Sequence, residues 1–153
     1  VIAQLLNRTR GLFFMEQHEF GSENDLAIYR LERAKTDLQS ARVLFDVAEY
    51  RGANNRAYYA IYHAITAVHA LDGRAYKRHK DALANFNKDY IRTEIFPKVM
   101  GRKISEAQEI RHASDYDDFY IATKAEALEQ IETAEKLISL IDRYCRQRIG
   151  AEF

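Results

Sequence analysis

The stretch that decides the fold is Asn54–His69, which has the sequence NNRAYYAIYHAITAVH. Its apolar side chains recur at every third or fourth position, and this spacing predicts one helix with a buried stripe. The stripe consists of Tyr58, Ile61, Ile65 and Val68. Polar or half-polar side chains lie beside it, namely Arg56, Tyr59, Tyr62, His63 and His69. We therefore expect a central helix, covered by other helices, that either gains specificity from these groups or carries a site.

Composition bounds the kind of protein that this helix belongs to. The chain has 153 residues, of which 47% are hydrophobic and 30% charged, a balance typical of one soluble domain. Lys plus Arg and Asp plus Glu both number 23, so no global positive field attracts nucleic acid, although a local basic patch stays open. The single cysteine, Cys145, excludes an internal disulfide and predicts a cytoplasmic protein. No apolar run is long enough to span a bilayer, so we expect no membrane partner.

Residues 1–20 differ in pattern from the rest of the chain. They hold arginines and apolar residues but no clean apolar block followed by a small-residue cleavage site, so we do not expect a signal peptide. We expect either an N-terminal extension that lies upstream of the domain and is weakly ordered, or a short docking helix. The helical domain is expected over residues 21–150.

Helical periodicity and helix-ending signals give the expected order of elements in this domain. The first helix covers Asn24–Tyr50 and ends at Arg51-Gly52, and the second, Asn54–His69, ends near Asp72-Gly73. A short helix follows over His79–Tyr90, a break comes at Pro97, and helix resumes after Gly101. A linker over Asp115–Tyr120 leads to the last helix, which begins at Thr123. On the first helix we expect Asp37 to face water. The pattern predicts an all-α, antiparallel four-helix bundle with one additional short helix.

Metal and cofactor motifs are absent from the sequence. A di-iron bundle needs two Glu-x-x-His pairs and two further inward glutamates, whereas the chain has one such pair, Glu109 with His112. Cys145 has no Cys-x-x-Cys partner, and its position on the apolar stripe of the last helix predicts a core thiol. We also find no glycine-rich phosphate loop and no nucleophile elbow. We therefore expect no metal and no cofactor.

The chain resembles the HEPN superfamily (higher eukaryotes and prokaryotes nucleotide-binding) in three places. These are NNRAYYAIYHA in the second helix, His79 at the start of the third, and Arg111 followed by Asp115-Tyr116. In particular, the chain resembles small stand-alone prokaryotic members with S/N-R-A-Y-Y-A in the second helix and a later R-x-x-x-D-Y. The resemblance covers roughly Asp25 to Ile149. It implies an antiparallel four- or five-helix bundle that forms a homodimer.

The resemblance also implies a function. Many relatives are metal-independent ribonucleases, often toxins paired with a small nucleotidyltransferase. Their signature is an arginine followed, after four to six residues, by a histidine, and the two copies of this pair meet at the dimer cleft. The histidine moves a proton from a ribose 2′-OH while the arginine holds the scissile phosphate. This chain departs from the signature, because the positions after Arg111 that should offer histidine hold Tyr116, Asp117 and Asp118.

Candidate roles follow from the resemblance together with helical spacing. Arg56 and His63 are seven residues apart on one helix and so share a face. The candidates are His63 and Tyr116 for the proton, Arg56, Arg111 and His79 for phosphate, and Asp115 and Tyr59 for orienting the site. Tyr116 is a poor general base, since a tyrosine pKa lies near 10. The sequence therefore leaves open whether the chain is an enzyme.

Each candidate also has a structural interpretation. Arg56 can pair with a buried carboxylate such as Asp115, and Arg111 can pair with Asp115 along one helix. The tyrosines and His63 can fill a core or an interface, and His79 can cap a helix. Two functions stay open. One is binding of RNA or nucleotide phosphate at a homodimer cleft, in a toxin–antitoxin or defence pair with weak or altered ribonuclease activity. The other is an inactive module that dimerises and docks a nucleotidyltransferase through its tyrosine-rich surface.

Overall fold

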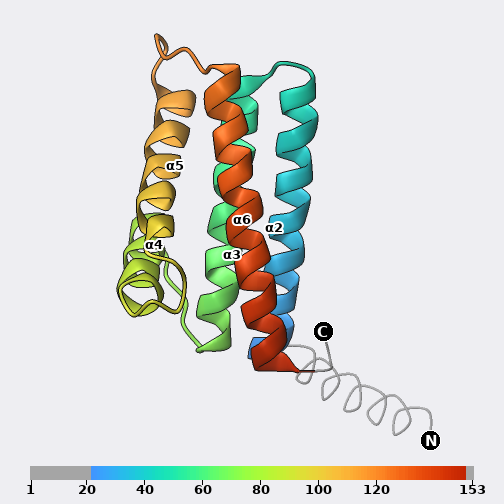
Figure 1. Ribbon diagram of the computed structural model, residues 1–153, viewed down its shortest axis with the longest axis vertical. Helices are drawn as coiled ribbons and strands as arrows, with labels where there is room; N and C mark the ends of the chain where they lie inside the picture. The colour runs from blue at the N-terminus through green and yellow to red at the C-terminus, as the bar shows by residue number, and fades with distance from the viewer. Residues whose placement is uncertain (1–21, 151–153) are drawn as a thin grey trace, which may run out of the picture.

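The computed structural model describes residues 22–150, so the expectations for residues 1–20 lie outside the described part. Its elements are α2 (Glu23–Asp46), α3 (Tyr50–Leu71), α4 (His79–Phe86), the π-helical turn η1 (Asn87–Ile91), α5 (Val99–Tyr116) and α6 (Lys124–Ile149). No strand occurs in residues 22–150. The helices α2, α3, α5 and α6 run antiparallel along the long axis, with α4 folded beside the start of α5 (Figure 1). The prediction of an all-α antiparallel bundle with an additional short helix is confirmed.

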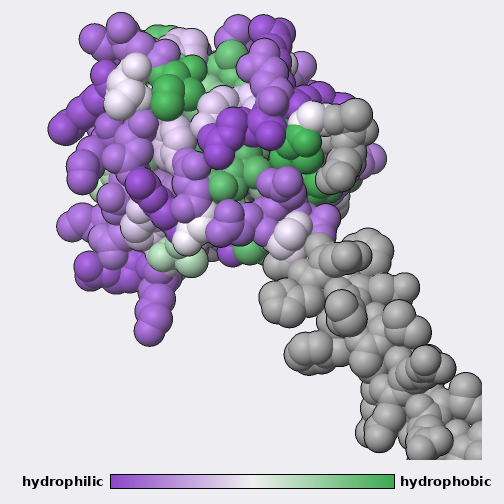
Figure 2. Space-filling model, turned by 90° about the horizontal axis from the view of Figure 1, so that it is seen from below, coloured by the Kyte–Doolittle hydropathy of each residue, from purple (hydrophilic) through white to green (hydrophobic). Residues whose placement is uncertain are grey.

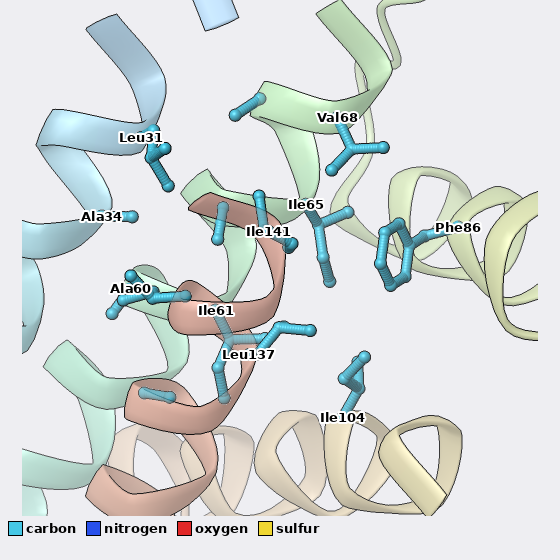
Figure 3. Packing of buried hydrophobic residues seen from close by; sticks show 14 of the residues in the cluster. Leu31, Ala34, Ala60, Ile61, Ile65, Val68, Phe86, Ile104, Leu137 and Ile141 are labelled. Atoms are coloured by element: carbon cyan, nitrogen blue, oxygen red, sulfur yellow. The ribbon is translucent and has the colours of Figure 1, made fainter. Parts of the chain in front are cut away.

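Helix α3 is the centre of the bundle, as its apolar stripe predicts. It packs against each of the other three long helices and against α4. Tyr58, Ile61, Ile65 and Val68 are at most 1% exposed. Figure 3 shows Ile61, Ile65 and Val68 of this stripe, with Leu137 and Ile141 of α6, Phe86 and Ile104 around them. Alanines on α3 let these neighbours approach closely, because a small side chain leaves room for the facing helix. They are Ala57, Ala60, Ala64 and Ala67, each 0% exposed.

The connection between α2 and α3 differs from the prediction. The expected helix end at Arg51-Gly52 is wrong, because both residues lie in the first turn of α3. The chain turns earlier, at residues 47–49, where Ala48 takes a left-handed φ of 61°. A Cβ on Gly52 would lie 3.2 Å from Cδ1 of Leu44. The glycine therefore serves the close approach of two helices rather than a turn.

The linker before α6 also begins later than predicted. Asp115 and Tyr116 are the last residues of α5, not part of a loop. The Arg51 guanidinium donates to the carbonyl oxygens of Ser114 and Asp117, each at 3.0 Å, and to that of Tyr120. It thereby satisfies carbonyls that the helix end would leave without partners. This contact, which the sequence reading missed, ties the end of α5 to the start of α3.

Most other boundaries follow their local signals. Ser22 Oγ accepts the N–H of Asp25 at 3.1 Å, and Thr123 Oγ accepts that of Glu126 at 3.2 Å. Both are N-caps; Thr123 is the predicted start of the last helix, and Ser22 lies two residues before the predicted start of the first. Gly73, with φ of 67°, follows the end of α3. The chain is non-helical at Pro97, and α5 begins at Val99, slightly before Gly101.

The described surface is mainly polar at the end of the bundle that Figure 2 shows. Hydrophilic residues cover most of that view, and hydrophobic residues come to the surface in smaller areas between them. Within residues 22–150, none of the helices combines the length and the apolar character that a bilayer crossing requires.

Candidate functional site

Polar and aromatic side chains from four helices meet on one side of α3. We call this group the α3 cluster. Its members are Asp37 of α2, Arg56, Tyr58, Tyr59, Tyr62 and His63 of α3, His79 of α4, and Arg111 and Asp115 of α5. The cluster brings together every candidate predicted from the sequence except Tyr116. Their roles in binding or catalysis stay predictions.

Asp37 is the member that the sequence reading missed. The expectation that it faces water is wrong, because the residue is only 8% exposed. Its Oδ2 lies 2.7 Å from Nδ1 of His63, and its Oδ1 lies 3.4 Å from Nη1 of Arg56. The signal was present, since Asp37 stands three residues after Ala34 and four before Ala41 on the buried stripe of α2. One carboxylate therefore holds an arginine and a histidine at the same time.

The contact with Asp37 sets the state of His63. An ionised carboxylate only accepts hydrogen bonds, so His63 Nδ1 must carry a proton and donate it. In the neutral ring this leaves Nε2 as an acceptor. Burial lowers the pKa of His63, an effect that Asp37 opposes and that the charges of Arg33 and Arg56 reinforce. The ring is therefore neutral at pH 7, as a general base must be.

Arg111 is held but not fully satisfied. Its guanidinium carbon lies 4.6 Å from the ring centre of Tyr58 and 5.7 Å from that of Tyr59. Nη1 lies 3.4 Å from Oδ2 of Asp115, so the ion pair along one helix forms. The buried Nε has no hydrogen-bond partner in the described part of the chain. Arg111 also contacts the Tyr58 hydroxyl, and its buried Nε is closed to solvent, so only the Nη groups could reach a further anion.

Arg56 pairs with Asp37 and not directly with Asp115. Its Nε and Nη2 donate to Oδ1 of Asn55 at 3.0 and 2.8 Å, and Nδ2 of Asn55 donates to Asp115 at 2.9 Å. Asn55 thus bridges Arg56 to the end of α5. The Arg56 side chain is 37% exposed, so the pair is not sealed in the interior. Its guanidinium carbon lies 4.8 Å from the ring centre of Tyr59, the ring that Arg111 also approaches.

His79 is held by the tyrosines of α3. Its ring stacks on Tyr62 with centroids 3.9 Å apart, and its Nδ1 lies 3.1 Å from the hydroxyl of Tyr58. Burial lowers the pKa of His79, and the positive charge of Arg111 lowers it further. Tyr58 is 1% exposed, so the interpretation of this tyrosine as core filler also holds. The tyrosines therefore pack the core and position a histidine with one and the same set of rings.

The surroundings of the cluster are basic although the whole chain is neutral. Arg30 and Arg33 of α2 line a hollow that also includes Tyr62 and His63. Within residues 22–150 neither of these two arginines forms an ion pair. With Arg56 and Arg111 they outnumber the carboxylates of the cluster. The local basic patch that overall composition left open is therefore present.

Tyr116 lies outside the cluster. It is the last residue of α5 and is 69% exposed, and its ring lies 5.0 Å from that of His112.

Cys145 is fully buried, in keeping with a core thiol, and burial raises its pKa to about 11. The described residues contain no group of three or more His, Cys, Asp or Glu side chains suited to a metal ion.

Comparison with known proteins gives consistent relatives. The chain is 26% identical over 115 residues to a "UPF0332 protein" of Thermotoga maritima, covering 75% of this chain and 87% of that protein. It is 28% identical over 117 residues to "Putative toxin MJ0605" of Methanocaldococcus jannaschii, covering 76% and 87%. A second protein of that organism, "Putative toxin MJ0142", is 28% identical over 97 residues, covering 63% and 66%. Residues 27–144 match the HEPN domain, which includes every member of the α3 cluster. The chain therefore belongs to the HEPN domain family.

Proposed function

We propose that this chain is a toxin-like HEPN protein that binds the phosphate backbone of RNA in the α3 cluster and cleaves it weakly without a metal. One observation carries the proposal. Guanidinium groups from two helices, Arg56 of α3 and Arg111 of α5, approach the ring of Tyr59 at 4.8 and 5.7 Å. Next to them stands His63, whose Nδ1 is held by a buried carboxylate.

The arginines suit a phosphate. A guanidinium presents paired donors that match two oxygens of a phosphate, and aromatic contacts hold its plane in place. Arg56 is 37% exposed and Arg111 is 14% exposed, and the carboxylate contact of each is long, at 3.4 Å. His79, beside Arg111, adds a third group that can contact the same anion. This assignment keeps the phosphate-binding roles of Arg56, Arg111 and His79.

His63 supplies the proton transfer. Its Nε2 takes the proton of a ribose 2′-OH, the 2′-oxygen forms a bond to phosphorus, and the bond from phosphorus to the 5′-oxygen breaks. The departing 5′-oxygen takes a proton from water, and the hydroxide that remains takes the proton from Nε2, which restores the neutral His63 ring. The products are a 2′,3′-cyclic phosphate and a free 5′-OH. We assign this step to His63 and not to Tyr116, because Tyr116 lies outside the cluster.

The proposal includes weak activity and a homodimer. The histidine that the family carries after its arginine is absent, and His63 comes from a different helix, so the attack geometry differs from that of active relatives. A homodimer would double the basic surface along the cleft in which the RNA lies. The toxin names of the archaeal relatives support the toxin part of the proposal. The proposal also includes a nucleotidyltransferase partner and a cytoplasmic location, which are expectations from the family resemblance alone.

Two arginine variants test this proposal. We expect Arg56→Ala and Arg111→Ala each to weaken binding of a single-stranded RNA at least about tenfold and to abolish cleavage, since each removes charge-assisted phosphate contacts. Binding is measured by fluorescence anisotropy and cleavage by gel electrophoresis. Arg102→Ala is the matched control, because Arg102 is an exposed arginine of α5 that pairs with Glu106. Unchanged RNA binding in both variants, with correct folding and mass, contradicts the proposal.

A second function is favoured by a different observation. Asp37 already pairs with Arg56, and Asp115 with Arg111, so in this alternative the charges serve to join α2, α3 and α5. The chain would then be an inactive module that dimerises and docks a nucleotidyltransferase. Under this alternative the same variants lower the melting temperature or the dimer mass, and the wild-type protein shows no RNA binding to lose. Light scattering after size exclusion, together with thermal melting, separates the two functions.

A further inference from the structure

A hollow next to the α3 cluster is lined partly by residues to which the proposed function gives no role. It has a volume of about 200 Å³ and lies between α2 and α3. Its lining consists of Tyr29, Arg30 and Arg33 of α2 and Tyr62, His63 and Thr66 of α3. The hollow therefore shares Tyr62 and His63 with the α3 cluster.

The hollow is positively charged and has no counter-charge of its own. No carboxylate is among its lining residues in the described part of the chain. Arg30 donates to the carbonyl oxygen of Thr66 at 3.1 Å, a neutral acceptor that leaves its charge in place. Arg33 is exposed and forms no ion pair in residues 22–150. The nearest acidic group of the cluster, Asp37, is already shared by Arg56 and His63.

The hollow also offers aromatic surface. Tyr29 is 60% exposed, so its ring is accessible from solvent. Tyr62 is held rigidly by its stacking on His79. Accessible aromatic rings beside arginines are the combination that binds single-stranded nucleic acid, because bases stack on the rings while the cations follow the backbone.

We propose that this hollow is a binding subsite for the nucleotide adjacent to the phosphate held by Arg56 and Arg111, with Tyr29 contacting the base and Arg33 the next phosphate. This inference rests on the proposed function, and it adds that the ligand is a strand of several nucleotides. A single nucleotide fills only the phosphate site. The side of α2 that carries Tyr29 and Arg33 therefore determines the path of the RNA.

Two probes separate the subsite from the phosphate site: a single-stranded uridine hexamer and uridine monophosphate. The variants Tyr29→Ala and Arg33→Gln are expected to weaken hexamer binding about tenfold, since a stacked base or a phosphate contact is lost. Both should bind the monophosphate as the wild type does. Arg33→Gln should also make the plot of log affinity against log salt concentration less steep, by the amount that corresponds to the loss of one phosphate contact. Arg42→Gln is the matched control, because Arg42 is an exposed arginine of α2 that pairs with Glu135 of α6.

The result that overturns the inference is hexamer binding by Tyr29→Ala and Arg33→Gln that equals binding by Arg42→Gln. If Arg111→Ala still weakens hexamer binding about tenfold in that experiment, the proposed function stands and only the subsite is wrong. If Arg111→Ala also has no effect on the hexamer, the proposed function fails together with the subsite. Circular dichroism of each variant checks that the helices are intact.

Discussion

At the scale of single residues, Asp37 connects the residue proposed for proton transfer, His63, with one proposed for phosphate binding, Arg56. Its two oxygens contact His63 and Arg56, which lie two turns apart on α3. A carboxylate next to a buried histidine fixes which ring nitrogen carries the proton, and it favours the protonated ring. Burial of His63 acts in the opposite direction and prevails, so its pKa is lowered.

Replacing this carboxylate gives a prediction at the same scale. In Asp37→Asn the negative charge that favours protonated His63 is lost, so the pKa of His63 should fall further below its ordinary value. The NMR titration of the His63 ring measures this directly and does not depend on any activity. Asp46→Asn, which removes an exposed carboxylate from the end of the same helix, is the control. A His63 titration that is the same in Asp37→Asn and wild type would refute the role of Asp37.

At the scale of elements, the helix starts are set by single capping residues. Thr123 accepts the N–H of Glu126 at 3.2 Å and begins α6, the helix that covers the core stripe of α3. A lost N-cap exposes a backbone donor without a partner. The stability of α6 therefore depends on a side chain outside its hydrophobic face.

We expect Thr123→Ala to lower the free energy of unfolding by about 1 kcal/mol, the usual cost of removing an N-cap. Urea denaturation followed by circular dichroism measures the change. Thr36→Ala is the matched control, because Thr36 is an exposed residue within α2 whose hydroxyl bonds back to the carbonyl of Glu32. Alanine there should leave stability equal or slightly raise it, since alanine is the better helix former. Equal losses in both variants would show that the cap contributes nothing.

At the scale of the whole molecule, three histidines make stability depend on pH. Burial is the largest cause that lowers the pKa of His63, His69 and His79. His69 lies deepest, at 1% exposed, with Nε2 donating to the carbonyl of Ala82 at 2.9 Å. Protonating any of these rings costs more in the folded chain than in the unfolded chain.

The sign of the resulting prediction follows from proton counting. As pH falls below about 6.5, these histidines become protonated in the unfolded chain but stay neutral in the folded chain. The free energy of unfolding therefore decreases until the pH reaches the pKa values of the folded chain. Hydrogen bonds to neighbouring side chains lower the pKa values of Asp72 and Asp142, although burial acts in the opposite direction. These two carboxylates therefore stop stabilising the fold only in a separate and more acidic pH range. Urea denaturation at about pH 7.5 and about pH 5.5 tests this. Stability that is constant or higher at the acidic point would contradict it.

What the sequence determined by itself is the set of helices and their buried stripes. Helical periodicity, caps and Pro97 act within a few residues, so Thr123, Ser22 and the stripe from Tyr58 to Val68 could be recognised without knowing their neighbours. Arg56, His63 and Arg111 could be named as candidates for the same reason, because their spacing and the family likeness are local.

Only the tertiary structure decided which charges meet. Asp37 lies on the α2 stripe, yet its burial depends on α3 presenting Arg56 and His63 at the same height. Asp115 became the partner of Arg111 because α5 continues to Tyr116, where Arg51 of α3 binds its last carbonyls. Tyr116, the last residue of α5, lies outside the cluster and is exposed. The physical reason is that pairing between helices depends on their relative rotation and height, which arise from packing the whole core and leave no mark in the periodicity of any single helix.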